Sequence, residues 1–389
     1  MKRCCAVCRV VFALVATMLL LAGCAHSPPQ AAAAELLHDA LFEPPAVQVD
    51  AREVLAMSDA MRRFADQTLL GPDAPLDRRR ALVDALQRRG ALLLDYDTER
   101  TRTAAEAYAQ RAGNCLSLTL MTASFARHLG LPVHFQRVLV DEEYSRSGTL
   151  FLAAGHVNVV VGRNGALRDP RESAWLTIDF LPQADLGRQR TRPLEERTVI
   201  AMYMNNRAAE ALAAGRPSDA YWWARGALLE DPQFLPGVNT LGVVYSRAAQ
   251  PQEAERALRY VIERDPDNLH ALANLSQLLR GQGRDAEAAP LAARVAELQP
   301  QAPFWYFDRG REALARGDYA AARDLLQREL RRQPNQHEVH FQLALAYFGL
   351  GDAARAERHL ALAKENSPTL GTQALYAGKL ERLRGLGTH

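Results

Sequence analysis

Apolar residues recur at helical spacing over most of the chain, and the spacing becomes strand-like in one central stretch. Asp50 and Asp77 each precede a segment with helical periodicity, which predicts helices over roughly 51–70 and 78–89. Thr103 opens a third, shorter helix through the capping-box spacing of a threonine followed three residues later by a glutamate. The first part of the chain is therefore expected to begin with several helices.

A longer helix is expected to follow at the polar run that precedes Cys115. Gly113 permits a tight turn there, and Asn114 can cap the helix. Apolar residues at helical spacing from Leu116 to Ala126 predict one buried stripe, and Gly130 ends the helix.

Beyond this helix the apolar residues alternate with a period of two. The pattern predicts three strands, over 133–140, 156–161 and 175–180. His156 stands at the start of the second strand, and Asp179 lies near the end of the third. Helices followed by such strands predict an α+β first domain.

The second half of the chain repeats with a fixed period. Five prolines recur every 34 residues, namely Pro232, Pro266, Pro300, Pro334 and Pro368. A 34-residue period is typical of tetratricopeptide repeats, and these residues resemble that family. Five repeats over 201–368 are expected to stack into an all-α right-handed superhelix that recruits a protein or peptide, with 369–389 as a capping helix.

The N-terminus indicates export. Three cations precede an apolar run that is too short to cross a bilayer, as in a signal peptide. The run Leu-Ala-Gly-Cys24 resembles the lipobox of bacterial lipoproteins, which implies cleavage after residue 23, lipid (diacylglycerol and palmitate) on Cys24 and a tether over 24–40. An ordinary signal peptide with a chance cysteine is the alternative. Because Ala25 is not aspartate, the sorting rule of that family favours the outer membrane, with the protein facing the periplasm.

Charge and motifs exclude several classes of function. The chain has 47 basic and 45 acidic residues, and removal of Lys2, Arg3 and Arg9 with residues 1–23 leaves 44 against 45. A net charge of −1 does not indicate nucleic-acid binding. The sequence has no Walker loop, no dinucleotide glycine fingerprint and no HExxH motif, so we expect no cofactor and no metal.

Cys115 is then the one free thiol of the mature chain, since Cys4, Cys5 and Cys8 leave with the signal peptide and Cys24 carries lipid. A lone thiol cannot form an internal disulfide. At a helix start it lies near unpaired N–H groups and the positive end of the helix dipole, which favour a thiolate and could hold an oxyanion. Tyr96 could supply a second oxyanion donor. A buried, inert cysteine is the alternative.

The order of a cysteine on a helix, a histidine on a strand and an acid on the next strand resembles the transglutaminase-like superfamily of papain-like cysteine enzymes. The resemblance lies in residues 112–118, 126–131, 156–159 and 175–179, and the domain would cover 41–200. It implies Cys115 as the nucleophile, His156 as its base and Asp179 as the group that orients the histidine. Many relatives carry an aromatic residue where this chain has Asn158, which could hydrogen-bond in the site or face solvent.

Other residues compete for two of these roles. His128 lies at the far end of the cysteine helix, about 20 Å away at 1.5 Å per residue, and cannot be the base. His134 begins a strand near that same end. Asp169 precedes a proline and is typical of a turn, whereas Asp179 stands between two apolar residues, where a carboxylate needs a partner.

The resulting hypothesis is an envelope lipoprotein that acts on peptide or protein amides through a thioester. Water as the second nucleophile makes the protein a cysteine protease or amidase, and a lysine amine makes it a crosslinking enzyme; hydrolysis is favoured because of the bacterial relatives. The alternative is a catalytically inactive scaffold, anchored in the membrane, whose repeats assemble other proteins.

Overall fold

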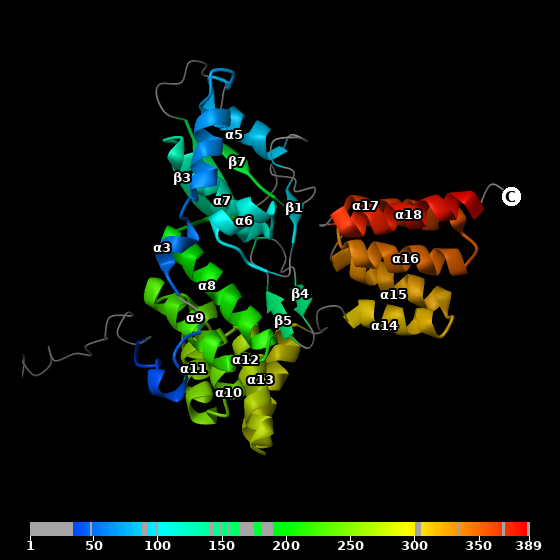
Figure 1. Ribbon diagram of the computed structural model, residues 1–389. Coiled ribbons are helices and arrows are strands. Elements are labelled where there is room, and N and C mark those ends of the chain that lie inside the picture. Colours follow the sequence, from blue (N-terminus) through cyan, green and yellow to red (C-terminus); the bar gives the residue numbers. More distant parts are fainter. Residues whose placement is uncertain are drawn as a thin grey trace, which may run out of the picture.

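The computed structural model of the chain describes residues 34–46, 49–87, 92, 94–97, 100–139, 144–147, 150–153, 156–163, 175–180, 190–299, 305–332, 334–367 and 370–386. Within these ranges, an N-terminal mixed α/β region with a four-stranded antiparallel sheet precedes an all-α array of repeats (Figure 1). The predicted signal segment, Cys24, Asp169, Pro300 and Pro368 lie outside the described residues.

The single helix expected over 51–70 is wrong, because the structure divides it. Asp50 caps only the short helix α3 by accepting a hydrogen bond from the Arg52 N–H. Ser58 then starts a new helix by accepting from the Met61 N–H at 3.2 Å, since a serine at this position satisfies an otherwise unpaired donor. The elements are η1 (Asp39–Leu41), α3 (Ala51–Val54), α4 (Asp59–Phe64), the π-helical η2 (Ala65–Leu69) and α5 (Arg78–Gln87).

The capping box at Thr103 is confirmed, and it begins α6 (Ala104–Gln110). The following helix, α7 (Cys115–His128), is also confirmed, but its burial differs from the expected single stripe. Every side chain from Leu116 to Ala126 is buried. The polar ones hydrogen-bond to carbonyl groups, as Thr119 does to Val157 at 3.2 Å, and α7 is therefore the central helix of this region.

The sheet has the strand order β7-β6-β3-β8, and all neighbours in it are antiparallel. The three strands expected from the sequence are present, while β8 forms an edge that the sequence pattern did not predict. Alternation along β6 places Val157, Val159 and Val161 in the core and puts His156 on the other face. The strands are β3 (Val133–Leu139), β6 (His156–Gly162), β7 (Trp175–Ile178) and β8 (Arg190–Leu194), beside the short pairs β1 (Asp95–Tyr96) with β2 (Ala112–Gly113) and β4 (Tyr144–Ser147) with β5 (Leu150–Ala153).

Paired helices with a 34-residue period follow the sheet, as predicted. The helices are α8 (Glu196–Ala213), α9 (Pro217–Glu230), α10 (Leu235–Arg247), α11 (Pro251–Arg264), α12 (Leu269–Gly281), α13 (Asp285–Leu298), α14 (Trp305–Ala315), α15 (Tyr319–Arg332), α16 (His337–Gly349), α17 (Ala353–Glu365) and α18 (Leu370–Leu386). One alanine of each pair is at most 1% exposed, which lets the helices approach closely: Ala220, Ala254, Ala288, Ala322 and Ala356.

The turn between the two helices of each pair has one residue in the left-handed region. Glycine occupies this position in four pairs, at Gly215, Gly283, Gly317 and Gly351. In the remaining pair Ala249 adopts a φ of 56° at the same register, although its side chain disfavours this conformation.

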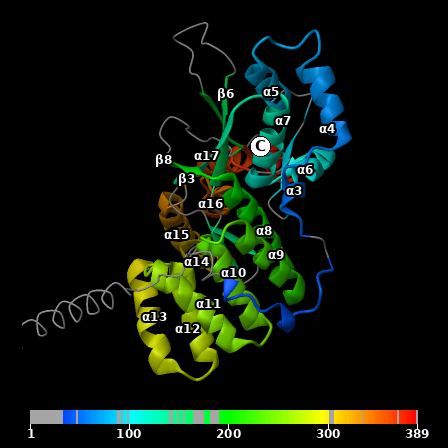
Figure 2. The ribbon, with the colours of Figure 1, turned by 90° about the vertical axis from the view of Figure 1, so that its left-hand side faces the viewer.

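Residues 36–43, which include the end of the tether expected over 24–40, lie against the first repeats (Figure 2). Phe42 stacks on Tyr221 with 4.1 Å between ring centroids, and the Tyr245 hydroxyl donates to the Leu36 carbonyl at 2.7 Å. Asp39 accepts from the Tyr221 hydroxyl at 2.6 Å. This part of the segment is therefore fixed in place rather than a free linker.

Within the described ranges, no helix has the length and apolar character needed to cross a membrane.

Candidate active site

Cys115 is the first residue of α7 and is half-buried. Asn114 caps the helix, and its Oδ1 accepts a hydrogen bond from the Ser117 N–H at 2.9 Å. The N–H groups of the first turn that precede Ser117 have no partner within an α-helix, so they lie beside the thiol as potential donors to an anion.

Gly113 lets the backbone before Cys115 pack closely against Ser117, and it does not form the tight turn that the sequence suggested. The residue with a left-handed backbone is Arg111, at a φ of 55°. Gly113 lies in β2, and a Cβ atom there would come within 2.7 Å of the Ser117 Cβ. The β2 strand pairs with β1, which fixes the chain immediately before Cys115.

His156 and Asp179 form a buried pair beside this helix start. The distance between His156 Nε2 and Asp179 Oδ1 is 2.6 Å, and the two side chains are 3% and 2% exposed. The register pairs Val159 with Ile178, so one step further along places Asp179 opposite Asn158 and diagonal to His156. The pairing of β6 with β7 thus brings together two residues that are 23 apart in the sequence.

The second ring nitrogen of His156 is available to the thiol. A carboxylate can only accept, so Nε2 carries the proton that binds Asp179. Nδ1 is buried and has no hydrogen-bond partner within hydrogen-bonding distance. Burial opposes the charged ring, but the hydrogen bond to Asp179 and the electrostatic interactions with Cys115 and Asp179 outweigh it and raise the pKa of His156 to about 9. The three predicted site residues therefore lie together.

Asn158 is the residue of this site whose part the sequence left open. It is 1% exposed, and its Nδ2 lies 3.4 Å from Asp179 Oδ2. Its Oδ1 is buried without a partner. Asn158 thus contacts the oxygen of Asp179 that His156 does not use.

The two other histidines considered as the base, His128 and His134, lie away from Cys115. His128 Nε2 is 2.7 Å from Asp66 Oδ1 at an exposed position, at the far end of α7. The His134 ring packs against Trp175 with 4.7 Å between centroids. The side chain of Tyr96 is outside the described residues.

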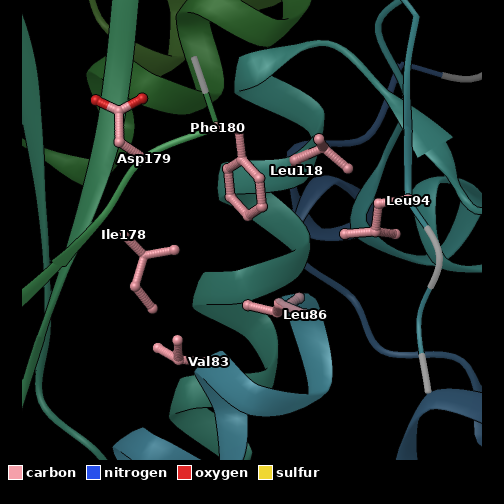
Figure 3. A pocket seen from close by; sticks show the side chains of 7 residues that line it. All are labelled: Val83, Leu86, Leu94, Leu118, Ile178, Asp179 and Phe180. Atoms are coloured by element: carbon pink, nitrogen blue, oxygen red, sulfur yellow. The ribbon is translucent and has the colours of Figure 1, made fainter. Parts of the chain in front are cut away.

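A cavity of about 190 Å³ lies behind Asp179, on the core side of the strand (Figure 3). The Asp179 carboxylate points away from the apolar side chains in this view, and Cys115 is not part of the wall. The cavity is lined by Val83, Leu86, Leu94, Leu118, Ile178, Asp179 and Phe180. It is a gap between α5, α7 and β7, and neither Cys115 nor His156 lines it.

Within the described residues, no group of three or more histidine, cysteine, aspartate or glutamate side chains could hold a metal ion.

Comparison with known proteins bears on the second half of the chain. The family of tetratricopeptide repeats matches residues 239–303 and 307–370. The C-terminal part of this protein is a tetratricopeptide-repeat region. The match begins after α9, so it covers neither the sheet nor α7, and a search of curated proteins finds no match.

Solved structures show partial likeness to the chain. A structure described as "MamA MSR-1 C2" is 24% identical, with 43% of this chain and 95% of that chain covered and a TM-score of 0.24. A thermophilic TPR protein of Thermus thermophilus, TTC0263, is 21% identical, with 46% and 98% covered and a TM-score of 0.26. The pilF protein of Pseudomonas aeruginosa is 21% identical, with 49% and 87% covered and a TM-score of 0.27. Scores this low do not establish a shared arrangement.

Proposed function

We propose that this chain is an envelope lipoprotein whose first region is a transglutaminase-like cysteine enzyme that hydrolyses peptide or protein amides. The observation that carries the proposal is the 2.6 Å contact between His156 Nε2 and Asp179 Oδ1, because it leaves the buried Nδ1 for Cys115. A histidine held in this way by a carboxylate is the arrangement that activates a nucleophile.

The proposed reaction has two steps. The Cys115 thiolate attacks the amide carbonyl, N–H groups at the start of α7 bind the oxyanion, and His156 Nδ1–H protonates the leaving amine. His156 Nδ1 then takes a proton from water, which attacks the thioester and releases the acid and the thiol. A lysine amine in place of water would give a crosslink.

The repeats support recruitment of a protein, since tetratricopeptide repeats suggest protein–protein interaction. The lipobox supports lipid on Cys24 and an outer-membrane location. Mass spectrometry of the N-terminal peptide from membrane fractions tests the anchor, with Cys24→Ala as the control.

Alkylation by iodoacetamide, followed by mass spectrometry, tests the nucleophile. At pH 7 the folded protein is expected to alkylate at Cys115 at least about tenfold faster than the unfolded chain, and His156→Gln should remove the difference. Equal rates in folded and unfolded protein, or no effect of His156→Gln, would sink the enzyme proposal and leave the second candidate, an inactive scaffold whose repeats provide the function.

Labelling of new protein N-termini in envelope extracts tests the reaction. New termini that appear with the wild type and not with Cys115→Ala support hydrolysis. Crosslinked species without new termini would instead assign transamidation.

A further inference from the structure

The first repeat contacts the loop before α6, and this loop is bonded to the start of the nucleophile helix α7. Thr101 lies in this loop and is 2% exposed. Glu210 of α8 accepts from the Thr101 N–H at 2.6 Å, and Arg207 of α8 donates to the Thr101 carbonyl at 3.1 Å. Both backbone polar groups of a buried loop residue are thus satisfied by side chains more than 100 positions away in the sequence.

Thr101 also binds the cap of the nucleophile helix. Asn114 Nδ2 donates to Thr101 Oγ1 at 2.9 Å, while Asn114 Oδ1 accepts from both the N–H and the hydroxyl of Ser117 at 2.9 Å. The Arg102 N–H donates to Ser117 Oγ at 2.8 Å. These bonds form a continuous network from α8 to the first turn of α7, where Cys115 lies.

A second contact holds the opposite end of the same helix. Arg127, in the last turn of α7, pairs with Glu196 in the first turn of α8. Figure 2 shows α8 extending down from the mixed region into the array of repeats. The repeat helix therefore contacts the last turn of α7 directly and is linked to its first turn through Thr101.

We propose that Thr101, Arg207 and Glu210 are positioning residues for Cys115, so that the first repeat is part of the support of the active site and not a separate recruiting module. The proposal rests on the nucleophilic role proposed for Cys115. Asn114 Oδ1 accepts from the Ser117 N–H, and Thr101 holds the amide in that orientation by accepting from its Nδ2. Arg207 and Glu210 hold Thr101 where it can do so. When the hydrogen bonds from α8 to Thr101 are lost, the first turn of α7 opens more often and the thiol moves relative to His156.

Hydrogen exchange of the Ser117 amide tests the connection directly. In Glu210→Ala this amide is expected to exchange about tenfold faster, the scale of one lost hydrogen bond, while the Val159 amide in the sheet keeps its rate. Glu210→Gln retains an acceptor for the Thr101 N–H and should keep the wild-type rate. Glu230→Ala, at the end of α9, is the matched control.

A second pair of variants tests the threonine side chain without disturbing α8. Thr101→Val keeps the shape and removes the acceptor for Asn114, so it should raise Ser117 exchange about tenfold, whereas Thr101→Ser should restore protection. Unchanged Ser117 exchange in both Glu210→Ala and Thr101→Val overturns the inference.

Alkylation of Cys115 in the same variants separates the two proposals. We expect its rate at pH 7 to fall about tenfold in Glu210→Ala and to be restored in Glu210→Gln. If Ser117 exchange responds as stated but wild-type Cys115 alkylates no faster than the unfolded chain, the nucleophile proposal is wrong and the link from α8 to the helix start stands. If wild-type Cys115 is reactive and Glu210→Ala changes neither readout, the link is wrong.

Discussion

Replacement of Asp179 by asparagine removes one charge from the buried pair with almost no change of shape. The Asp179 contact is the first of the interactions that raise the pKa of His156 to about 9 against the opposing effect of burial. In Asp179→Asn the burial of the ring remains while the carboxylate is gone. We therefore expect the pKa of His156 to fall by about 1–3 pH units.

The same shift determines how stability depends on pH. The folded-state pKa of about 9 lies above the ordinary value of 6.5, so the folded protein holds this proton more tightly than the unfolded chain does. The resulting stabilisation is complete below pH 6.5 and is lost as the pH rises through about 9. Its full size is roughly 3 kcal/mol. In Asp179→Asn the stabilisation that is lost as the pH rises should be smaller, and its loss should be complete at a lower pH.

Titration of the histidine ring by NMR between pH 5 and 10, with isotope-labelled histidine, measures the pKa. Urea unfolding at pH 6 and pH 9 measures the change in stability. Asp66→Asn removes the carboxylate beside the exposed His128 and is the control, because it should leave the His156 titration unchanged. A wild-type midpoint near 6.5, or an identical midpoint in Asp179→Asn, would refute the proposed electrostatics of the site.

Three further substitutions test local packing. Gly113→Ala brings a Cβ within 2.7 Å of the Ser117 Cβ and should lower the free energy of unfolding in urea by about 1–3 kcal/mol. Ala249→Gly relieves a left-handed backbone and should raise that free energy by about 0.5–1 kcal/mol. Tyr245→Phe removes the hydroxyl that donates to the Leu36 carbonyl, so limited proteolysis between residues 36 and 46 should become about three- to tenfold faster.

Each substitution has a matched control in the same chain. Gly281→Ala meets nothing within 4 Å and should not destabilise the protein. Gly283→Ala places a side chain at a φ of 73° and should lower stability by about as much as Ala249→Gly raises it. Tyr260→Phe, on α11, should leave proteolysis unchanged. If the Gly113→Ala variant is as stable as the wild type, the start of α7 can shift to admit a methyl group and the prediction is wrong.

The repeat region could be predicted closely because its signals are local. A proline, a small residue and a left-handed turn recur every 34 positions, and each acts on its own pair of helices. The exception at Ala249 shows that packing of the two helices can impose a conformation that the residue itself disfavours. The division of 51–70 was missed because a serine within a periodic apolar segment can lie inside a helix as well as cap one, and only the structure shows Ser58 as a cap.

The candidate site could be predicted in its residue types but not in its geometry. Cys115 was singled out as the lone thiol at a helix start, and His156 and Asp179 through the resemblance of their order to the transglutaminase-like superfamily. The sequence did not indicate that Asn158 would lie beside Asp179, since this depends on how β6 and β7 pair.

By itself the sequence determined the repeats and most of the helices and strands, since periodicity and caps act over a few residues; the division of 51–70 and the strand β8 are the exceptions. It also supplied the three residues of the candidate site. Only the tertiary structure decided which nitrogen of His156 is left for Cys115, that Thr101 is held by α8, and that residues 36–43 bind the first repeats. These contacts join positions from 23 to more than 200 residues apart. Their geometry depends on strand register and on the packing of α7 and α8, which no local pattern records.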